Sequence, residues 1–212
     1  HRDDDSSSIA DNIIRKVYLD SKGGLWVGTE KGLSFYDRDK DSFRNFSTGG
    51  KTVTGIAEDS NGRFIVATGG SLRIFNSNTW NWEISAPPCQ PETFGATILY
   101  RDKEDIWIGT GTDGLFSYSI GSREIKRISA FKSNCSIQCL LNHDGKIWIA
   151  TEGDGLHSID LADGSLKVYH HTDAARSLNS NFVRALQTDS DGNLWIGTFN
   201  GLSILDGDGF IN

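Results

Sequence analysis

Five similar segments recur along the chain at intervals of roughly 40 residues, and this repetition limits the possible folds more than any other feature. In each segment an apolar run ends in a small residue and a threonine, and a leucine follows within a few residues. A period of roughly 40–45 residues that contains several short strands is typical of a β-propeller, in which each repeat forms one blade. The segments are GLWVGTEKGLSFYD from Gly24, RFIVATGGSLRIFN from Arg63, DIWIGTGTDGLFSYS from Asp105, KIWIATEGDGLHSID from Lys146 and NLWIGTFNGLSILD from Asn193.

The pattern divides each repeat into strands and turns. An alternating run comes first, and an Asp-x-x-Gly turn follows it at 20–23, 59–62 and 189–192. The aspartate side chain accepts hydrogen bonds from nearby backbone amides, and glycine adopts a positive φ without strain. This turn can therefore close a hairpin. The second strand carries a large residue that we expect to pack between blades: Trp26, Ile65, Trp107, Trp148 or Trp195. The third strand begins at the leucine, and a later apolar residue predicts a fourth strand at Phe43, Trp82, Ile125 and Leu166.

These patterns predict an all-β fold, a β-propeller of four-stranded antiparallel blades. About five blades fall within this chain, and we expect them to form part of a larger propeller. We interpret residues 1–11 as a flexible N-terminal segment and 12–212 as propeller. The final residues, 207–212, are too short to predict a fourth strand for the last repeat. The expected repeats are 12–50, 51–90, 91–133, 134–175 and 176–212.

The charge balance argues against some partners. The chain has 21 Lys and Arg against 28 Asp and Glu, a net charge of −7, whereas nucleic acids and membrane surfaces attract basic patches. No apolar run approaches a membrane span, so we expect no direct membrane insertion, and HRDDDSSS lacks the apolar stretch of a signal peptide. We expect Cys89, Cys135 and Cys139 to be buried thiols, and a disulfide from Cys89 to one of the others stays open.

Patterns that resemble catalytic or binding motifs are interpreted as architecture. The GxGxxG at 109–114 is followed by a strand, whereas a dinucleotide loop requires a helix. Asp189–Asn193 resembles part of a calcium loop but lacks the distal glutamate. No nucleophile elbow or HExxH motif occurs. The sequence therefore predicts no catalytic residues, no metal site and no cofactor, and we expect the chain not to be an enzyme.

Candidate ligand-binding residues are expected in loops that differ between repeats, because loops on a rigid scaffold often carry function. Trp80 is added because no other repeat has a tryptophan at its position, and packing at a blade edge is the alternative. The loop candidates are Phe199, Asn200, His170, His171, Arg176 and Asn179.

The sequences SLNSNFVRAL at 177–186 and DSDGNLWIGTFNGLSILD at 189–206 resemble the two-component regulator propeller repeat, and the resemblance extends from about Asn12 to Asp206. The second repeat departs most, with Ile65 in the tryptophan position. The resemblance implies a fragment of the periplasmic sensor region of hybrid two-component systems of Bacteroidetes, which pair such sensors with a histidine kinase. It also implies an oligosaccharide ligand from carbohydrate breakdown. The implied partners are the remaining propeller and β-sandwich parts of the receptor and a second copy in a homodimer. Two alternatives stay open: a protein-interaction or dimerisation scaffold without its own ligand, and a propeller-type lyase or hydrolase.

Overall fold

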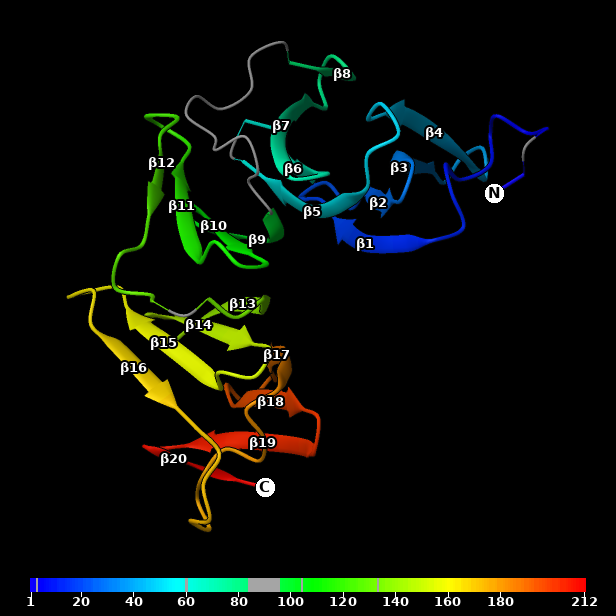
Figure 1. Ribbon diagram of the computed structural model, residues 1–212. Coiled ribbons are helices and arrows are strands. Elements are labelled where there is room, and N and C mark those ends of the chain that lie inside the picture. Colours follow the sequence, from blue (N-terminus) through cyan, green and yellow to red (C-terminus); the bar gives the residue numbers. More distant parts are fainter. Residues whose placement is uncertain (3, 60, 84–95, 104, 133) are drawn as a thin grey trace. The chain divides into compact units, whose positions relative to one another are not determined.

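The computed structural model describes residues 1–212 except 3, 60, 84–95, 104 and 133. The described residues contain strands and turns but no helix. Twenty strands form five four-stranded antiparallel sheets, each made of four consecutive strands, which confirms the predicted blades (Figure 1).

The chain divides into two compact units. The first unit, His1–Ile106 with Tyr118–Ile125, contains the first and second blades. The first blade consists of β1 (Ile14–Leu19), β2 (Leu25–Thr29), β3 (Gly32–Asp37) and β4 (Ser42–Ser47). The second consists of β5 (Val53–Glu58), β6 (Arg63–Thr68), β7 (Ser71–Asn76) and β8 (Asn81–Trp82). Residues of the third blade belong partly to each unit, and its strands are β9 (Ala96–Asp102), β10 (Asp105–Thr110), β11 (Leu115–Ser119) and β12 (Ile125–Arg127).

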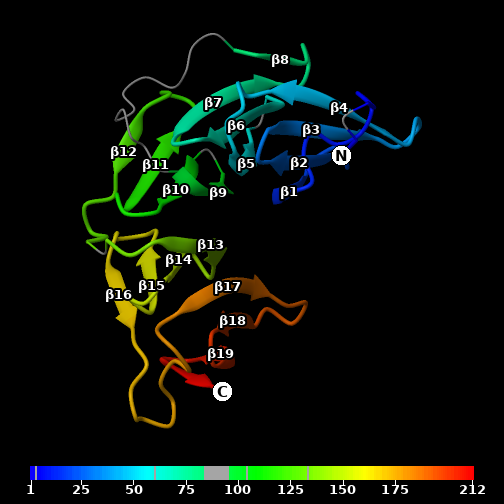
Figure 2. The same cartoon turned by 45° about the vertical axis from the view of Figure 1, so that its right-hand side comes forward.

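The second unit, Trp107–Ser117 with Lys126–Asn212, contains the fourth and fifth blades. In this unit the first strand of the fifth blade lies against the first two strands of the fourth (Figure 1 and Figure 2). The fourth blade consists of β13 (Ile137–His143), β14 (Lys146–Thr151), β15 (Leu156–Asp160) and β16 (Leu166–Tyr169). The fifth consists of β17 (Val183–Thr188), β18 (Leu194–Thr198), β19 (Gly201–Asp206) and β20 (Gly209–Ile211).

The predicted fourth strands are present: β4, β8, β12 and β16 contain Phe43, Trp82, Ile125 and Leu166. The expectation that the last repeat lacks a fourth strand is wrong, because β20 pairs with β19 from Asp206↔Gly209 to Ile204↔Ile211. Gly207 has a φ of 58° and permits a two-residue turn, which is shorter than the connections in the other repeats. The short connection explains why the spacing rule missed this strand.

The aspartate of the Asp-x-x-Gly turn bonds both to the backbone of the hairpin turn and to a side chain of the core. In the first repeat Asp20 Oδ1 accepts from the amides of Lys22 and Gly24 at 2.9 and 2.6 Å, as the sequence predicts. Its second oxygen accepts from the indole Nε1 of Trp26 at 2.8 Å, which satisfies the polar atom of a nearly buried side chain. Asp189 and Trp195 repeat this bond at 2.7 Å. In the second repeat, which lacks the tryptophan, Arg63 Nε donates to Asp59 at 2.7 Å instead.

The hydrogen bond from the Trp195 indole lowers the pKa of Asp189, and this shift can be tested by titration. Hydrogen bonds from Trp195 and Asn193 lower the pKa of Asp189 from 3.8 to about 2. In the unfolded chain Asp189 takes up its proton at a higher pH than in the folded chain. The ionised carboxylate therefore stabilises the folded state above about pH 4, and this contribution is lost as the pH falls toward 2. We expect the indole NMR signal of Trp195 to keep its position down to about pH 3 and to shift near pH 2. The Trp148 indole donates to the carbonyl of His143 and serves as the control; a Trp195 midpoint near 3.8 would contradict the expectation.

Aromatic residues fill the space between the first two blades. Trp26 is 1% exposed, and its ring centroid lies 4.7 Å from Phe64, 4.9 Å from Phe35 and 5.5 Å from Phe75. In the second unit Trp148 belongs to a buried cluster with residues of the fifth blade. Trp107 is also buried, but Trp195 is only half-buried. The tryptophan side chain is therefore buried in three repeats, packs between blades in the first and fourth, and is partly uncovered in the last.

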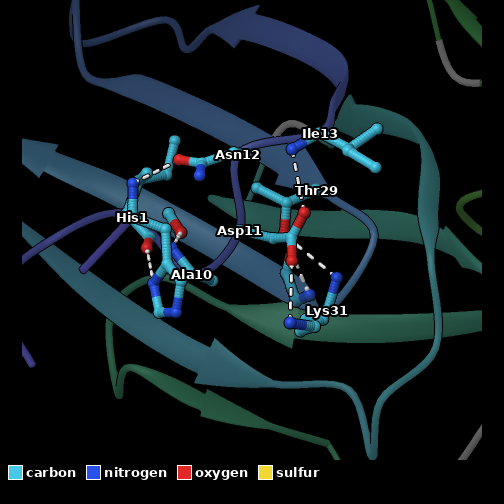
Figure 3. Close-up of polar contacts among 10 residues, drawn as sticks. His1, Ala10, Asp11, Asn12, Ile13, Thr29 and Lys31 are labelled. Carbon is cyan, nitrogen blue, oxygen red and sulfur yellow. Dashed lines mark hydrogen bonds and ion pairs between the residues drawn. The ribbon is translucent and has the colours of Figure 1, made fainter. Parts of the chain in front are cut away.

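The N-terminal segment makes specific contacts with the first blade. The backbone amide of Phe43 donates to Ser7 O at 2.7 Å, and Asn45 Nδ2 donates to Ser8 O at 2.7 Å. Asp11 is nearly buried, accepts from the amide of Ile13 at 2.8 Å and pairs with Lys31 at 3.1 Å (Figure 3). The flexibility of residues 1–11 stays a prediction, as do the repeat boundaries. Cys135 and Cys139 are half-buried and not buried as predicted, and Cys89 lies outside the described residues.

Candidate ligand-binding surface

A β-bulge near the start of the first strand re-aims one side chain in at least four blades. The pairing register shifts between Ile14 and Lys16, Val53 and Gly55, Ile137 and Cys139, and Val183 and Ala185. The skipped residues are polar: Arg15, Thr54, Gln138 and Arg184. Arg15 pairs with Glu30 in the turn between β2 and β3. The bulge thus supplies one polar side chain in each of these four blades, and in the first blade that side chain lies beside the turn that joins the second and third strands.

In the second unit two of these bulge residues meet at one carboxylate. Arg184 donates to Glu152 Oε1 at 2.8 Å and to Gln138 Oε1 at 2.9 Å. Gln138 Nε2 donates to the other oxygen of Glu152 at 3.1 Å. Arg184 and Glu152 are each about 40% exposed at the side chain, so solvent and ligands reach this network. The three side chains offer both donors and acceptors on the surface shared by the fourth and fifth blades.

Two exposed aromatic rings lie beside this network. Phe182 and Phe199 are 44% and 63% exposed, and their rings meet edge to face with centroids 5.5 Å apart. The Arg184 guanidinium lies 4.8 Å from the Phe199 ring centroid. We call Phe182, Phe199, Arg184, Glu152 and Gln138 the aromatic platform. It combines apolar ring surface with charged and amide groups, an arrangement suited to a ligand with both apolar and hydroxyl faces.

Comparison between blades shows that the scaffold does not require aromatic residues in this place. The Phe199 amide donates to Phe182 O at 3.1 Å, and the same backbone bond joins a residue pair in three other blades. Those pairs carry other residue types, so the backbone bond does not itself require the two phenylalanines of the fifth blade. The corresponding pairs are Glu30 with Ile13, Gly69 with Thr52, and Glu152 with Ser136.

The connection between β16 and β17 borders a hollow of about 470 Å³. Tyr169, His170, Arg176, Ser177 and Phe210 are among its lining residues. Arg176 pairs with Asp206 at 2.6 Å, which fixes the guanidinium beside the last hairpin. The Tyr169 ring packs against Phe210 with centroids 5.5 Å apart. This hollow is a second place in the same unit that could hold a small polar molecule.

A second hollow, of about 420 Å³, is lined by His157, Asp154, His170, Lys132 and Cys135, among others. His157 is 4% exposed, and burial lowers its pKa. Its Nε2 lies 3.0 Å from the Asp154 carbonyl oxygen, whereas Nδ1 has no hydrogen-bond partner among the described residues. The ring also packs against Phe131, with centroids 5.0 Å apart. The environment therefore holds His157 neutral near pH 7.

The structure places six of the seven candidate residues in the second unit and Trp80 in the first. Phe199 belongs to the aromatic platform, and His170 and Arg176 line the 470 Å³ hollow. Three candidates instead hold the loops together. Asn179 Nδ2 donates to Asn200 O at 2.9 Å and Asn200 Nδ2 returns a bond to Asn179 O at 3.3 Å, while His171 Nδ1 lies 2.8 Å from Leu178 O.

Trp80 packs on the aromatic cluster of the first unit. Its ring stacks with Trp26 and Phe46, each at a centroid distance of 5.8 Å, and Arg44 lies 4.2 Å from its centroid. One part of the side chain stays accessible and borders a small hollow. These contacts favour the packing alternative, and a ligand role for Trp80 stays a prediction.

Sequence reasoning missed Phe182, Arg184, Gln138 and Glu152 as candidate binding residues. The alternating run at 182–186 predicts a first strand that includes Phe182, whereas β17 begins only at Val183. A signal for Phe182 exists, because aligned repeats have Ile13, Thr52 and Ser136 in its position. The bulge that exposes Arg184 and Gln138 leaves no mark in the sequence, since both residues follow a buried β-branched residue in an ordinary strand pattern.

No helix among the described residues has the length and apolar character needed to cross a membrane. In the part of the chain that the structure describes, no group of three or more His, Cys, Asp or Glu side chains could hold a metal ion.

Several solved structures share the fold. An extracellular domain assigned to a hybrid two component system of B. thetaiotaomicron is 23% identical, with a TM-score of 0.78 over 91% of this chain and 27% of that one. A second such domain from this organism is 21% identical, with a TM-score of 0.76 over 97% and 30%. Virginiamycin B lyase from Staphylococcus aureus is 11% identical, with a TM-score of 0.74 over 96% and 71%.

The chain thus spans less than a third of the length of the two extracellular domains. No protein of curated function matches the sequence. The family model described as two component regulator propeller matches residues 8–31 and 177–200, which contain the first two strands of the first and fifth blades. These matches confirm the resemblance in the first and fifth blades, where residues 8–31 and 177–200 match the two component regulator propeller model.

Proposed function

We propose that this chain is part of the extracytoplasmic sensor module of a two-component signalling receptor. The family match in the first and fifth blades supports the proposal, as do the related folds of extracellular domains from hybrid two component systems. Its partners would be the other propeller and β-sandwich parts of such a receptor and a second receptor copy. The periplasm is the location that we propose for a bacterial receptor of this type.

We further propose that the module binds an oligosaccharide through the aromatic platform. The observation that carries this proposal is the exposed Phe182–Phe199 pair beside Arg184, Glu152 and Gln138. Sugar rings present apolar CH faces that stack on aromatic rings, and their hydroxyl groups bond to charged and amide side chains. None of the three corresponding pairs in the other blades contains an aromatic residue, which directs the proposed site to the fifth blade.

A thermal-shift screen of the chain against a panel of glycan fragments tests the proposal. A ligand that binds only the folded state raises the melting temperature by mass action, in proportion to the logarithm of its concentration. We expect at least one fragment to raise it, and Phe199→Ala to weaken that fragment roughly fivefold to tenfold, the loss of about 1 kcal/mol of ring stacking.

Ile13→Ala is the matched control, because Ile13 occupies the position of Phe182 in the first repeat and is similarly exposed. This variant should bind the fragment as the unmodified chain does. If no fragment raises the melting temperature at millimolar concentration, the result would contradict the oligosaccharide proposal and favour a protein-interaction scaffold. A shift that Phe199→Ala leaves unchanged would move the site away from the platform.

A further inference from the structure

The fourth strand of one blade and the turn before the fourth strand of the next blade are joined by an ion pair in the second unit. Lys167 of β16 donates to Asp208, with 2.6 Å between Nζ and Oδ1. Asp208 is the residue just before β20, so it belongs to the fifth blade. The positive charge on the outer strand of the fourth blade is therefore balanced by a carboxylate of its neighbour.

The first two blades have the corresponding cation but not the carboxylate. The strand registers place Arg44 of β4 in the position of Lys167, since each lies two residues before an aromatic residue that pairs with the first leucine of the third strand. Trp80, just before β8, takes the position of Asp208. The Cζ atom of Arg44 lies 4.2 Å from the Trp80 ring centroid. An aromatic ring attracts a guanidinium but carries no net charge, so this contact leaves the positive charge of Arg44 unbalanced.

Arg44 and Trp80 border a hollow of about 310 Å³ in the first unit, and two further cations line it. Lys22 comes from the turn between β1 and β2, and Arg38 comes from the turn between β3 and β4. Within the part of the chain that the structure describes, none of these three cations forms an ion pair. We call Lys22, Arg38, Arg44 and Trp80, with the hollow between them, the basic hollow.

The carboxylates at the basic hollow do not cancel these charges. Two of them line it, and Asp37 is already paired with Lys40 at 3.0 Å. Asp39, the other one, is exposed to solvent. Positive charge therefore exceeds negative charge at this place, although the chain as a whole has a net charge of −7. A local field of this sign attracts anions.

The basic hollow lies between two blades that are both present in the chain. Arg44 belongs to the first blade and Trp80 to the second. The turn that carries Lys22 is also attached to the second blade, because the amide and hydroxyl of Ser21 donate to Glu58 at 2.7 and 2.9 Å. The hollow is thus formed by contacts within the first unit and not by the outer faces of the first and last blades.

Trp80 holds the guanidinium of Arg44 in place at a cost in backbone strain. Its φ of 57° lies in the left-handed region, which a tryptophan rarely adopts. The ring is fixed by stacking on Trp26 and Phe46, each at a centroid distance of 5.8 Å. A guanidinium that stacks on a fixed ring can present its N–H groups to an oxyanion with little further loss of conformational freedom.

We propose that the basic hollow binds a small organic anion, a molecule of about monosaccharide size that carries a carboxylate or sulfate group. Arg44 donates paired N–H groups to the oxyanion, and Lys22 and Arg38 add positive charge from two neighbouring turns. The anion supplies the negative charge that Asp208 supplies to the corresponding cation in the second unit. A volume of about 310 Å³ is at the lower end for ligand pockets, which favours a single small molecule over a long chain.

Isothermal titration calorimetry with glucuronate, glucose 6-sulfate and glucose, at constant ionic strength, tests the proposal. We expect at least one of the two anions to bind, and their relative affinities distinguish a carboxylate from a sulfate site. Glucose has a similar size but no charge and should not bind. Arg44→Gln should weaken the bound anion about tenfold, because it removes a charge-assisted pair of hydrogen bonds. The indole NMR signal of Trp80 should shift during the titration and saturate with the anion.

Arg73→Gln is the matched control for Arg44→Gln. Arg73 also lies 4.2 Å from a tryptophan ring centroid in the first unit, that of Trp82, but it does not line the basic hollow. This variant should bind the anion as the unmodified chain does. Trp80→Asp places a carboxylate where the second unit has Asp208, and its pairing with Arg44 should abolish anion binding.

Three results would overturn the proposal: binding of neither anion, equal binding of glucose, or an Arg44→Gln variant that binds as tightly as the unmodified chain. Circular dichroism confirms that each variant is folded. Arg44 is exposed and can be replaced without opening the core, so its variant decides the test even where Trp80→Asp fails to fold. Phe199→Ala alters only the aromatic platform and should leave this binding unchanged, which keeps the test separate from that of the oligosaccharide proposal.

Discussion

Replacement of Trp26 by alanine is expected to lower the free energy of unfolding by about 4 kcal/mol. The Trp26 ring contacts aromatic side chains of both the first and second blades, including Phe35, Phe64 and Phe75, so its removal leaves a cavity between two sheets. It also removes the donor to Asp20, whose carboxylate orders the first turn. Urea denaturation followed by circular dichroism measures the change.

Trp195→Ala is the matched control for this prediction. Trp195 occupies the same repeat position and donates the same hydrogen bond to an aspartate, but the structure leaves it half-buried. Because less apolar surface is lost, we expect a cost of about 2 kcal/mol. Equal costs at both positions, measured at concentrations where the chain is monomeric, would contradict the view that Trp26 acts mainly by filling the space between blades.

Replacement of Gly155 by alanine is expected to lower the free energy of unfolding by about 3 kcal/mol. Gly155 has a φ of 73°, which strains any other residue, and a Cβ there would lie 2.2 Å from the carbonyl oxygen of Tyr169. That oxygen belongs to the backbone of β16, whose end pairs with Leu156, so it cannot move aside without breaking the hairpin. Urea denaturation of the variant gives the value.

Gly164→Ala separates strain from steric overlap. Gly164 has a nearly identical φ of 74°, but a Cβ there would meet no atom within 4 Å. We expect a cost of about 1 kcal/mol, which is the strain of the left-handed backbone alone. If both variants lost the same stability, the close approach of Gly155 to β16 would not matter, and the prediction would fail.

The blades could be predicted from the sequence because their determinants lie close together in the chain. The hairpin turn at Asp20 and the fourth strand at Phe43 depend on local spacing, and the structure confirms both. The role of the second carboxylate oxygen could not be predicted, because an isolated Asp-x-x-Gly pattern accounts only for backbone bonds. Comparison of Trp26 with Arg63, two donors in different repeats, makes that role visible.

The candidate site was harder to predict, because it combines residues from two blades. Phe199 was identified as a turn residue that differs between repeats, and the structure adds its partner Phe182. The Glu152 network depends on bulges that turn Gln138 and Arg184 outward, and such a shift of register is set by pairing between strands. Asn179 and Asn200 are predicted because their loops differ between repeats, but their mutual hydrogen bonds follow only from the loop conformation.

The guanidinium of Arg63 in the place of an indole has a consequence for how related repeats are recognised in other sequences. A repeat that has lost its signature aromatic residue still folds as a blade, because the aspartate needs a donor of suitable reach and accepts either chemistry. Searches that count blades by their tryptophans will therefore undercount degenerate repeats, and pairing each turn aspartate with a downstream arginine would recover some of them.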